Sequence, residues 1–404
     1  MNNTQPLWKN DMMQREVVVT ALARTAIGSF GGSLKDVPLA RLATVVVQAT
    51  LERSGVAPGE VGHVVMGNVI PTEPRDAYLS RIAAMDAGIP QETPAYNVNR
   101  LCGSGLQAIV SAAQTILLGD ADVAIGAGAE SMSRGAYLMP GARWGTRMGD
   151  NTLLDFTTGI LHDPWAGNHM GVTAENVAGR HGITREMQDA LALESQRRAA
   201  HAIAAGYFRD QIVPVEIRNG KTTSVFDTDE HPRVVTPEAL AKMKAVFQAD
   251  GTVTVGNASG INDGAAAVML AEAGRARALG LQPLARLVAY AHAGVEPQYM
   301  GMGPVPATQL ALRKAGLRVG DLSVIESNEA FAAQACAVAR ELGFDPARVN
   351  PNGSGISLGH PVGATGAILV VKAISELQRT GGRYALVTMC IGGGQGIAAI
   401  FERI

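Results

Sequence analysis

The 404-residue sequence lacks several features that would each point to a particular class of protein. Its three cysteines, Cys102, Cys336 and Cys390, form no CxxC pair, which excludes a disulfide framework and a paired-cysteine redox or zinc motif. Its eight histidines include no HExxH or other ligand spacing, so no metal site is expected. The sequence also has neither a GxGxxG fingerprint nor a P-loop, and therefore implies neither NAD nor ATP.

Charge and long apolar runs are scarce as well. Charged residues make up 17% of the chain and the net charge is -2, so nothing indicates a nucleic-acid or anionic-membrane partner. We expect no apolar run of membrane-spanning length, and the N-terminus lacks a secretory segment, so a cytoplasmic protein is expected. Residues 1–12 are polar and without pattern, and are expected to be a disordered extension or the result of an upstream start.

Apolar residues and glycine are plentiful. Hydrophobic residues make up 47% of the chain, enough for two or three domains with substantial cores. Glycine accounts for 47 of 404 residues, about 12% against a usual share of about 7%. Because the glycines gather in a few motifs, they indicate tight functional turns rather than low complexity.

Strand and helix patterns alternate along most of the chain. In the first part we expect strands at 16–21, 62–69, 94–98 and 122–128 and helices at 38–53, 76–87 and 103–118. Continuous apolar strands in such an alternation are typical of a parallel sheet covered on both faces. After residue 262 we expect strands at 265–270, 284–290, 322–326, 384–389 and 396–401 and helices at 307–315, 330–342 and 363–377.

Residues 132–261 differ in character from the rest. Tryptophan, proline and charged residues increase there, and a long amphipathic helix is expected from Thr184 to about Gly206, with Thr184 as its N-cap. This segment interrupts the strand–helix alternation. It is therefore predicted to be an insertion.

An internal repeat links the two ends of the chain. Residues 50–61 align without gaps on 311–322, the triplet at 97–99 corresponds to that at 350–352, and 122–128 corresponds to 384–394. Three similarities in the same order favour a duplication. Two similar α/β units would bring equivalent turns together, and these turns hold Cys102 in one copy and His360 in the other. In parallel α/β sheets, ligands bind at the ends of strands where such turns lie.

Cys102 follows an expected strand and begins a turn that leads into an apolar helix. The first-turn N–H groups and the helix dipole would favour a thiolate there, and Gly103 and Gly105 would let a substrate carbonyl approach the backbone. The alternative is a buried structural cysteine, which this stretch on its own favours. Cys336 lies among small apolar residues of an expected helix, and core packing explains it better than chemistry.

Three further clusters favour a catalytic role for Cys102 over a structural one. They are Gly359-His-Pro-Val-Gly-Ala-Thr-Gly, which holds His360; Glu326-Ser-Asn-Glu-Ala-Phe, which holds Asn328; and Met389-Cys-Ile-Gly-Gly-Gly-Gln-Gly, which holds Cys390. Together with the Cys102 turn they resemble the signature blocks of the thiolase family, from about Val17 to Ile404. The resemblance is greatest to bacterial short-chain β-ketothiolases, which include acetyl-CoA acetyltransferases and the broad-range type that forms 3-ketovaleryl-CoA.

The resemblance implies an α/β architecture. It is the duplicated thiolase fold, with two pseudo-symmetric half-domains, layered helices and mixed sheets in the order αβαβα, and an inserted loop domain over the CoA site. The N-terminal half-domain would span 1–131, completed by 262–282, the loop domain 132–261, and the C-terminal half-domain 283–404. A homotetramer, built as a dimer of dimers, is implied in the same way.

The resemblance also implies the reaction, a reversible Claisen condensation of acetyl-CoA with acetyl-CoA or a short acyl-CoA to 3-ketoacyl-CoA and CoA. Such chemistry belongs to fatty acid metabolism or polyhydroxyalkanoate precursor synthesis, and CoA is a substrate, so no cofactor is implied. By resemblance Cys102 carries the acyl group, His360 activates it, and Cys390 is the acid and base. Asn328 would hold a water that forms one oxyanion hole with His360, and the backbone N–H groups of Cys102 and Gly392 would form a second.

A less specific set of eight residues matches the family's binding pocket for CoA and the acyl group. Leu161, His169, Met170, Phe247, Ser259, Met300 and Phe331 match the pantetheine and acyl part, and Arg233 would contact the adenosine end of CoA. Each apolar member would otherwise be read as ordinary core. The sequence departs from the family at Ala239, where many relatives have serine, and at Val255, where alanine is common; both leave CoA affinity and pocket size open.

Two other functions remain possible at this point. A ketoacyl synthase that uses carrier-protein thioesters shares the fold class and the cysteine nucleophile, but it would resemble a Cys-His-His set, whereas this chain has Cys-His-Cys. A non-catalytic acyl-CoA-binding paralogue is the second alternative. The presence of both Cys102 and Cys390 argues against it.

Overall fold

The computed structural model describes residues 15–145 and 147–404 and is organised around one ten-stranded sheet. The expected disordered extension at 1–12 lies outside these residues. In chain order the strands are β1 (Val17–Arg24), β2 (Gly28–Ser29), β3 (His63–Gly67), β4 (Ala95–Val98), β5 (Val123–Ser131), β10 (Asn262–Glu272), β11 (Ala285–Gly294), β12 (Leu322–Ser327), β13 (Tyr384–Ile391) and β14 (Gln395–Arg403).

The strand order shows the duplication directly. It runs β12-β13-β14-β11-β1-β10-β5-β3-β4, with β2 paired to β10. Read outward from the centre, β11, β14, β13 and β12 on one side repeat β1, β10, β5 and β3 on the other. β1 and β11 join the two halves through only two residue pairs, Val18 with Arg286 and Val19 with Ala285. The predicted pseudo-symmetric arrangement is thereby confirmed.

The sheet is mixed rather than parallel. β3 is parallel to its neighbours β4 and β5, and β12 is parallel to β13. The remaining pairs are antiparallel, including β10 with both β1 and β5. The simple parallel sheet expected from the apolar strands is therefore wrong, because a buried strand is apolar on both faces whatever the direction of its neighbours.

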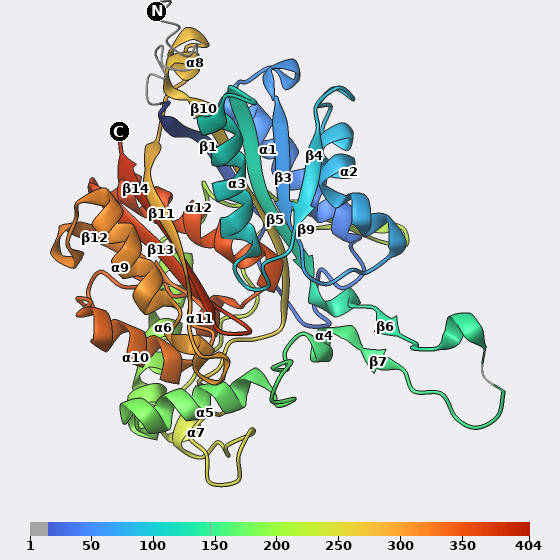
Figure 1. Ribbon diagram of the computed structural model, residues 1–404, viewed down its shortest axis with the longest axis vertical. Helices are drawn as coiled ribbons and strands as arrows, with labels where there is room; N and C mark the ends of the chain where they lie inside the picture. Colours follow the sequence, from blue (N-terminus) through green and yellow to red (C-terminus); the bar gives the residue numbers. More distant parts are fainter. Residues whose placement is uncertain (1–14, 146) are drawn as a thin grey trace, which may run out of the picture.

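Two central helices lie between the halves of the sheet (Figure 1). α3 packs on β3, β5 and β10, α12 packs on β5, β10, β12 and β13, and the two helices contact each other. α1 covers β1 and β10 on the outer side, and α9 covers β11 and β14. The bounds of the helices outside the insertion are α1 (Leu39–Ser54), α2 (Leu79–Asp86), α3 (Ser104–Leu118), α8 (Ala273–Ala278), α9 (Pro304–Ala315), α10 (Ala332–Leu342), α11 (Gly355–Leu358) and α12 (Val362–Thr380).

The central helix α3 also corrects an expectation about membranes. The stretch Leu101–Leu118 is long and apolar enough, by length and composition, to cross a membrane. However, 67% of it is buried inside the protein, where it packs against the sheet and α12. The helix of a buried core meets the same criterion as a membrane span.

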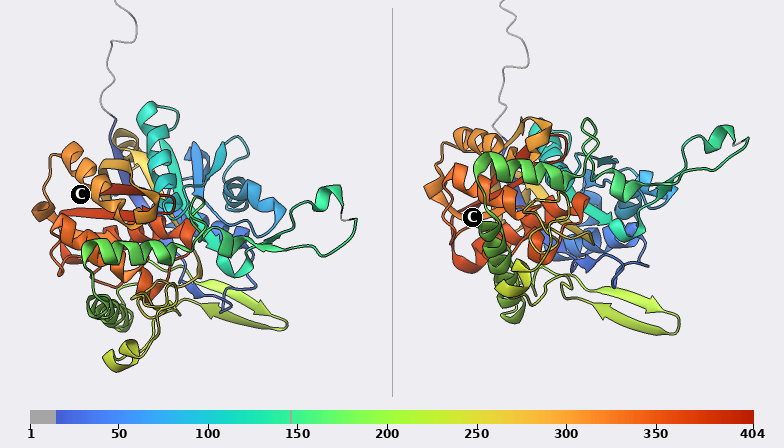
Figure 2. Two further views of the ribbon diagram at one scale, coloured as in Figure 1. Left: turned by 60° about the horizontal axis from the view of Figure 1, so that its bottom comes forward. Right: turned by 90° about the horizontal axis from the view of Figure 1, so that it is seen from below.

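The segment between β5 and β10 supplies helices on one side of the sheet and two projecting hairpins (Figures 1 and 2). α5 packs on α10, and α6 packs on α10, α11 and α7; the side chain of Thr184 caps α6 as predicted. The elements are β6 (Tyr137–Leu138), β7 (Leu154–Asp155), α4 (Phe156–Gly159), α5 (Met170–His181), α6 (Arg185–Ala204), β8 (Val215–Asn219), β9 (Thr222–Phe226) and α7 (Pro237–Ala241). Short 3-10 turns are η2 (Pro58–Glu60), η3 (Pro74–Tyr78), η4 (Met132–Arg134), η5 (Ala142–Trp144), η6 (Pro297–Met302) and η7 (Val319–Asp321).

Candidate active site

Cys102 lies in a strained turn that connects β4 to α3. Leu101 has a φ of 47°, and the N–H of Ser104 donates to the Leu101 carbonyl at 2.9 Å. In the described part of the chain only one other non-glycine residue, Asn350, has a positive φ, and it lies ahead of the equivalent turn in the second repeat. Positive φ at bulky residues is costly and persists where the surrounding structure holds it, often at functional sites.

The sulfur of Cys102 lies against groups from the far end of the chain. The backbone N–H of Gly392 donates to it, and Cys390 is close enough for the two thiols to influence each other. Burial raises the pKa of the Cys102 thiol, whereas the N–H groups of Gly392 and Cys102 itself lower it. The net shift is upward, so the thiolate expected from the helix dipole is not the resting form. The thiol needs a base.

His360 is a neutral imidazole with a defined tautomer. Its Nδ1 lies 2.7 Å from the hydroxyl oxygen of Thr365, and that hydroxyl donates to the Pro361 carbonyl at 2.9 Å. Since the hydroxyl proton is used, Nδ1 carries the hydrogen that Thr365 accepts, and Nε2 keeps its lone pair. Burial lowers the pKa of His360 to about 4. His360 can therefore accept a proton at neutral pH.

Asn328 stands beside the free nitrogen of His360. It directly follows β12, and its side-chain Nδ2 lies 3.4 Å from His360 Nε2. Asn328 is fully buried, and within residues 15–145 and 147–404 its Oδ1 has no hydrogen-bond partner. An unpaired buried acceptor next to an unprotonated imidazole nitrogen is suited to hold a water or a polar group of a ligand.

Cys390 and the glycines after it form the other wall of the site. Cys390 is the last residue but one of β13 and has 1% of its surface exposed, and both burial and the neighbouring Cys102 raise the pKa of its thiol. A side chain at Gly392 would place its Cβ 3.1 Å from Cε of Met170, and one at Gly394 would lie 2.3 Å from the Val295 carbonyl oxygen. Gly394 also has a φ of 83°, so only glycine fits there without a shift of the backbone.

The first turns of α3 and α12 meet backbone to backbone. A Cβ on Gly105 would lie 2.7 Å from the Ala367 nitrogen, and one on Gly366 would lie 2.3 Å from the Leu106 nitrogen. These contacts bring the helix that follows Cys102 against the helix that follows His360. The duplicated turns predicted to face one another are thus packed together.

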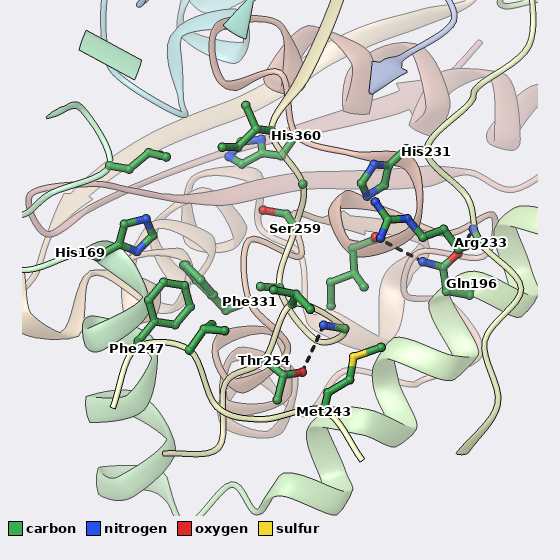
Figure 3. A pocket seen from close by; sticks show the side chains of 18 of the residues that line it. His169, Gln196, His231, Arg233, Met243, Phe247, Thr254, Ser259, Phe331 and His360 are labelled. Carbon is green, nitrogen blue, oxygen red and sulfur yellow. Dashed lines mark hydrogen bonds between the residues drawn. The ribbon is translucent and has the colours of Figure 1, made fainter. Parts of the chain in front are cut away.

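A cavity of about 560 Å³ opens from His360 toward the insertion (Figure 3). Six of the eight predicted pocket residues line it: Leu161, His169, Arg233, Phe247, Ser259 and Phe331. The ring of Phe247 stacks on His169 with centroids 4.6 Å apart and meets Phe331 edge-on at 6.1 Å. Apolar walls with a few polar groups are typical of sites for an elongated organic ligand.

The other two predicted pocket residues do not line this cavity. Met170 and Met300 are buried in the hydrophobic cluster that contains Cys390 and Phe331, and Cε of Met170 lies close to Gly392. Of the two departures from the family pattern, Val255 lines the cavity with 66% of its surface exposed. Ala239 is exposed on α7 and does not line it.

Several residues of the site were missed by the sequence analysis. Asn262 is fully buried, and its Oδ1 accepts the backbone N–H of His360 at 2.9 Å, while its Nδ2 donates to Nδ1 of His231 at 3.2 Å. His231 and Gln196 line the cavity beside Arg233 (Figure 3). Burial lowers the pKa of His231 to about 4. No spacing motif identifies these residues. The only feature of the sequence that pointed to the pocket was the position of His231, two residues before Arg233.

Comparison with known proteins identifies the family. Residues 17–274 match the thiolase N-terminal domain and residues 281–403 the thiolase C-terminal domain. The chain belongs to the thiolase family. It is 66% identical over 394 residues to the β-ketothiolase BktB of Cupriavidus necator, covering 97% of this chain and 100% of that protein. The resemblance seen in the sequence is confirmed, and with it the thiolase fold and the assignment as an enzyme.

Solved thiolase structures agree over nearly the whole chain. The acetyl-CoA acetyltransferase of Bacillus anthracis has a TM-score of 0.95 at 45% identity and covers 97% of this thiolase and 99% of its own chain. Human mitochondrial 3-ketoacyl-CoA thiolase in complex with CoA has a TM-score of 0.94 at 44% identity, covering 97% and 99%. At 45% and 44% identity these structures share the sequence family of this chain as well as its fold.

Proposed function

We propose that this thiolase catalyses the reversible Claisen condensation of acetyl-CoA with acetyl-CoA or a short acyl-CoA, through an acyl group carried on Cys102. The observation that carries the proposal is the position of the Cys102 sulfur, which accepts the N–H of Gly392 and lies beside the Cys390 thiol. One thiol in an oxyanion hole and a second thiol as its neighbour suit transfer of an acyl group followed by proton abstraction.

Acylation begins with His360. Its Nε2 takes the proton of the Cys102 thiol, and the thiolate attacks the thioester carbonyl of acyl-CoA. The N–H groups of Cys102 and Gly392 stabilise the oxyanion of the tetrahedral intermediate. The tetrahedral intermediate then collapses: the bond between the carbonyl carbon and the CoA sulfur breaks, and the bond to the Cys102 sulfur remains. The Cys390 thiol protonates the departing CoA thiolate. The enzyme then holds an acyl-Cys102 thioester, an imidazolium at His360 and a thiolate at Cys390.

Condensation uses the groups that acylation has charged. The Cys390 thiolate removes a proton from the α-carbon of acetyl-CoA, and the enolate oxygen is stabilised by the His360 imidazolium and a water held by Asn328. Acylated Cys102 is uncharged, so its effect of raising the pKa of Cys390 is absent at this step. The enolate attacks the acyl carbonyl, a carbon–carbon bond forms, and the Cys102 thiolate leaves and regains its proton from His360.

CoA and its thioesters are the substrates, and we propose no other cofactor. The cavity that leads to His360 would take the pantetheine arm, with Ser259, His169 and Arg233 as its polar contacts and Phe247 and Phe331 as its apolar walls. The relative whose solved structure holds CoA supports this assignment by its likeness. The exposed Val255 narrows the mouth of the cavity relative to alanine.

The proposal extends to assembly and setting. We propose a cytoplasmic homotetramer that serves fatty acid metabolism or polyhydroxyalkanoate precursor synthesis. The arm around β6 and β7 supports association, since Tyr137, Trp144 and Met148 expose 63%, 88% and 93% of their surfaces on it. Exposed apolar side chains of this kind mark interaction surfaces. Light scattering of the wild type and of a Trp144→Ser, Met148→Ser double variant measures the assembly.

The reaction is tested with purified protein and two acyl donors. With acetyl-CoA alone, acetoacetyl-CoA and CoA should appear in equal amounts, and Cys102→Ala should form neither. An acetyl group offered on a carrier protein should not replace acetyl-CoA. Turnover from the carrier protein alone would favour a ketoacyl synthase, and CoA binding without product would leave the non-catalytic alternative.

A further inference from the structure

A buried carboxylate lies between the two halves of the site. Glu130, in β5, is fully buried, and both of its oxygens accept hydrogen bonds. Oε1 accepts from Nδ2 of Asn68 at 2.8 Å and from the N–H of Ile70 at 3.0 Å. Oε2 accepts from the N–H of Val69 at 3.2 Å and from the N–H of Gly363 at 2.8 Å.

All four partners of Glu130 are donors. Three are backbone N–H groups, and the fourth is an amide whose orientation is set, because Nδ2 of Asn68 also donates to the Ala129 carbonyl at 3.1 Å. A glutamine would replace one accepting oxygen with an NH₂ group that faces donors. The site therefore requires two acceptor oxygens at this point, and a carboxylate supplies them.

These donors come from opposite repeats of the fold. Residues 68–70 follow β3, whereas Gly363 lies in the first turn of α12, three residues after His360. The fit around the carboxylate is tight, since a Cβ on Gly363 would lie 2.5 Å from Oε2. Burial raises the pKa of Glu130 to about 8, whereas its backbone donors lower it, and four donors with no acceptor among its partners favour the carboxylate form. In that form its charge raises the pKa of the Cys102 thiol, and Cys102 packs in the same apolar cluster as Val362.

We propose that Glu130 is a positioning residue that sets the placement of His360 relative to Cys102 by holding the start of α12 to the turn after β3. Glu130 does not line the cavity and makes no hydrogen bond to any of the proposed catalytic side chains. Its effect is therefore transmitted through the backbone of Gly363. The inference rests on the proposed function, because it concerns the pair of residues that performs acylation.

The test compares kcat with KM in Glu130→Gln. We expect kcat to fall about 10- to 100-fold, the range for a small misplacement of reacting groups, while KM for acetyl-CoA stays within about twofold because the cavity is untouched. Glu130→Asp keeps the charge but is one methylene shorter and cannot reach both repeats. Glu130→Asp should lower kcat in the same way, and it provides the test if the glutamine variant does not fold.

Glu175 offers a matched control. It is a buried carboxylate on α5 whose two oxygens accept from the N–H groups of Thr252 and Val253 and from the Thr252 hydroxyl, all within the insertion. Glu175→Gln should lower the melting temperature as Glu130→Gln does, yet leave kcat within about twofold. A general loss of stability would affect both variants alike.

The outcomes separate the inference from the function on which it rests. A wild type without turnover removes the proposed function. A wild type with turnover, together with folded Glu130 variants whose kcat lies within twofold of it, overturns only the role of Glu130. A rise in KM at constant kcat would also overturn it, because it would make Glu130 a determinant of binding.

Discussion

The Thr365 hydroxyl receives the Nδ1 hydrogen of His360 across 2.7 Å, and its own hydrogen goes to the carbonyl of Pro361. This pair determines which imidazole nitrogen is free to act as a base. Thr365 belongs to the motif that holds His360, but nothing in the spacing of that motif assigns it a role. Its place one turn into α12 brings it under the ring.

Replacing Thr365 with valine keeps the shape of the side chain and removes the acceptor. The imidazole can then carry its hydrogen on either nitrogen, and we expect kcat for condensation to fall by about 10- to 100-fold, within the range of general-base effects. KM for acetyl-CoA should change little. Thr365→Ser restores the hydroxyl and should recover most of the rate; an unchanged kcat in the valine variant would contradict the assignment of the tautomer.

Gly392 provides a second prediction. Gly392→Ala places a Cβ 3.1 Å from Met170 Cε, so Met170 or the Gly392 backbone with its N–H must shift by a few tenths of an ångström. Loss of a whole oxyanion-hole donor costs about 100- to 1,000-fold in kcat, and for a small displacement of the donor we expect a decrease of about tenfold. Gly320→Ala is the control, since no atom lies within 4 Å of a Cβ there. Equal rates in the two variants would remove Gly392 from the oxyanion hole.

His231 predicts how stability depends on pH. Because burial lowers its pKa from the usual value of 6.5 to about 4, the unfolded chain binds a proton at His231 between these two pH values and the folded chain does not. Its contribution to stability is present above pH 6.5 and is lost as the pH falls toward 4. Between pH 7 and pH 5 the loss is about 2 kcal/mol.

The measurement is urea unfolding of the wild type and His231→Gln at pH 7 and pH 5. The wild type should lose about 2 kcal/mol more than the variant over this interval. The variant removes the titrating group while keeping a side chain that can hydrogen-bond to Asn262. An identical pH dependence in both proteins would mean that His231 titrates normally in the folded state.

The fold and the principal site residues could be predicted because their signals are local or repeated in the sequence. The correspondence of 50–61 with 311–322 predicted that the turns of Cys102 and His360 lie together, and the mirrored strand order confirms the duplication. The helix dipole that lowers the pKa of the Cys102 thiol is visible in the sequence, whereas the burial that raises this pKa is not.

The roles of other site residues could not be predicted from the sequence. Glu130, Asn262 and Thr365 act through hydrogen bonds to residues that are mostly far away in the chain, and no spacing rule connects a carboxylate in β5 with the N–H of Gly363. Met170 and Met300 were assigned to the pocket by resemblance to the family. Their side chains lie in the buried cluster that also contains Cys390 and Phe331, and only tertiary packing could place them there.

The division of labour between the two thiols is the central claim, and one mass measurement on Cys390→Ser tests it most directly. After incubation with acetyl-CoA, the variant should carry one acetyl group on the peptide that contains Cys102, while it forms no acetoacetyl-CoA. Cys102→Ser, treated in the same way, should carry no acetyl thioester. Absence of the Cys102 adduct in a folded Cys390→Ser protein that binds CoA, or normal condensation by that variant, would contradict the account.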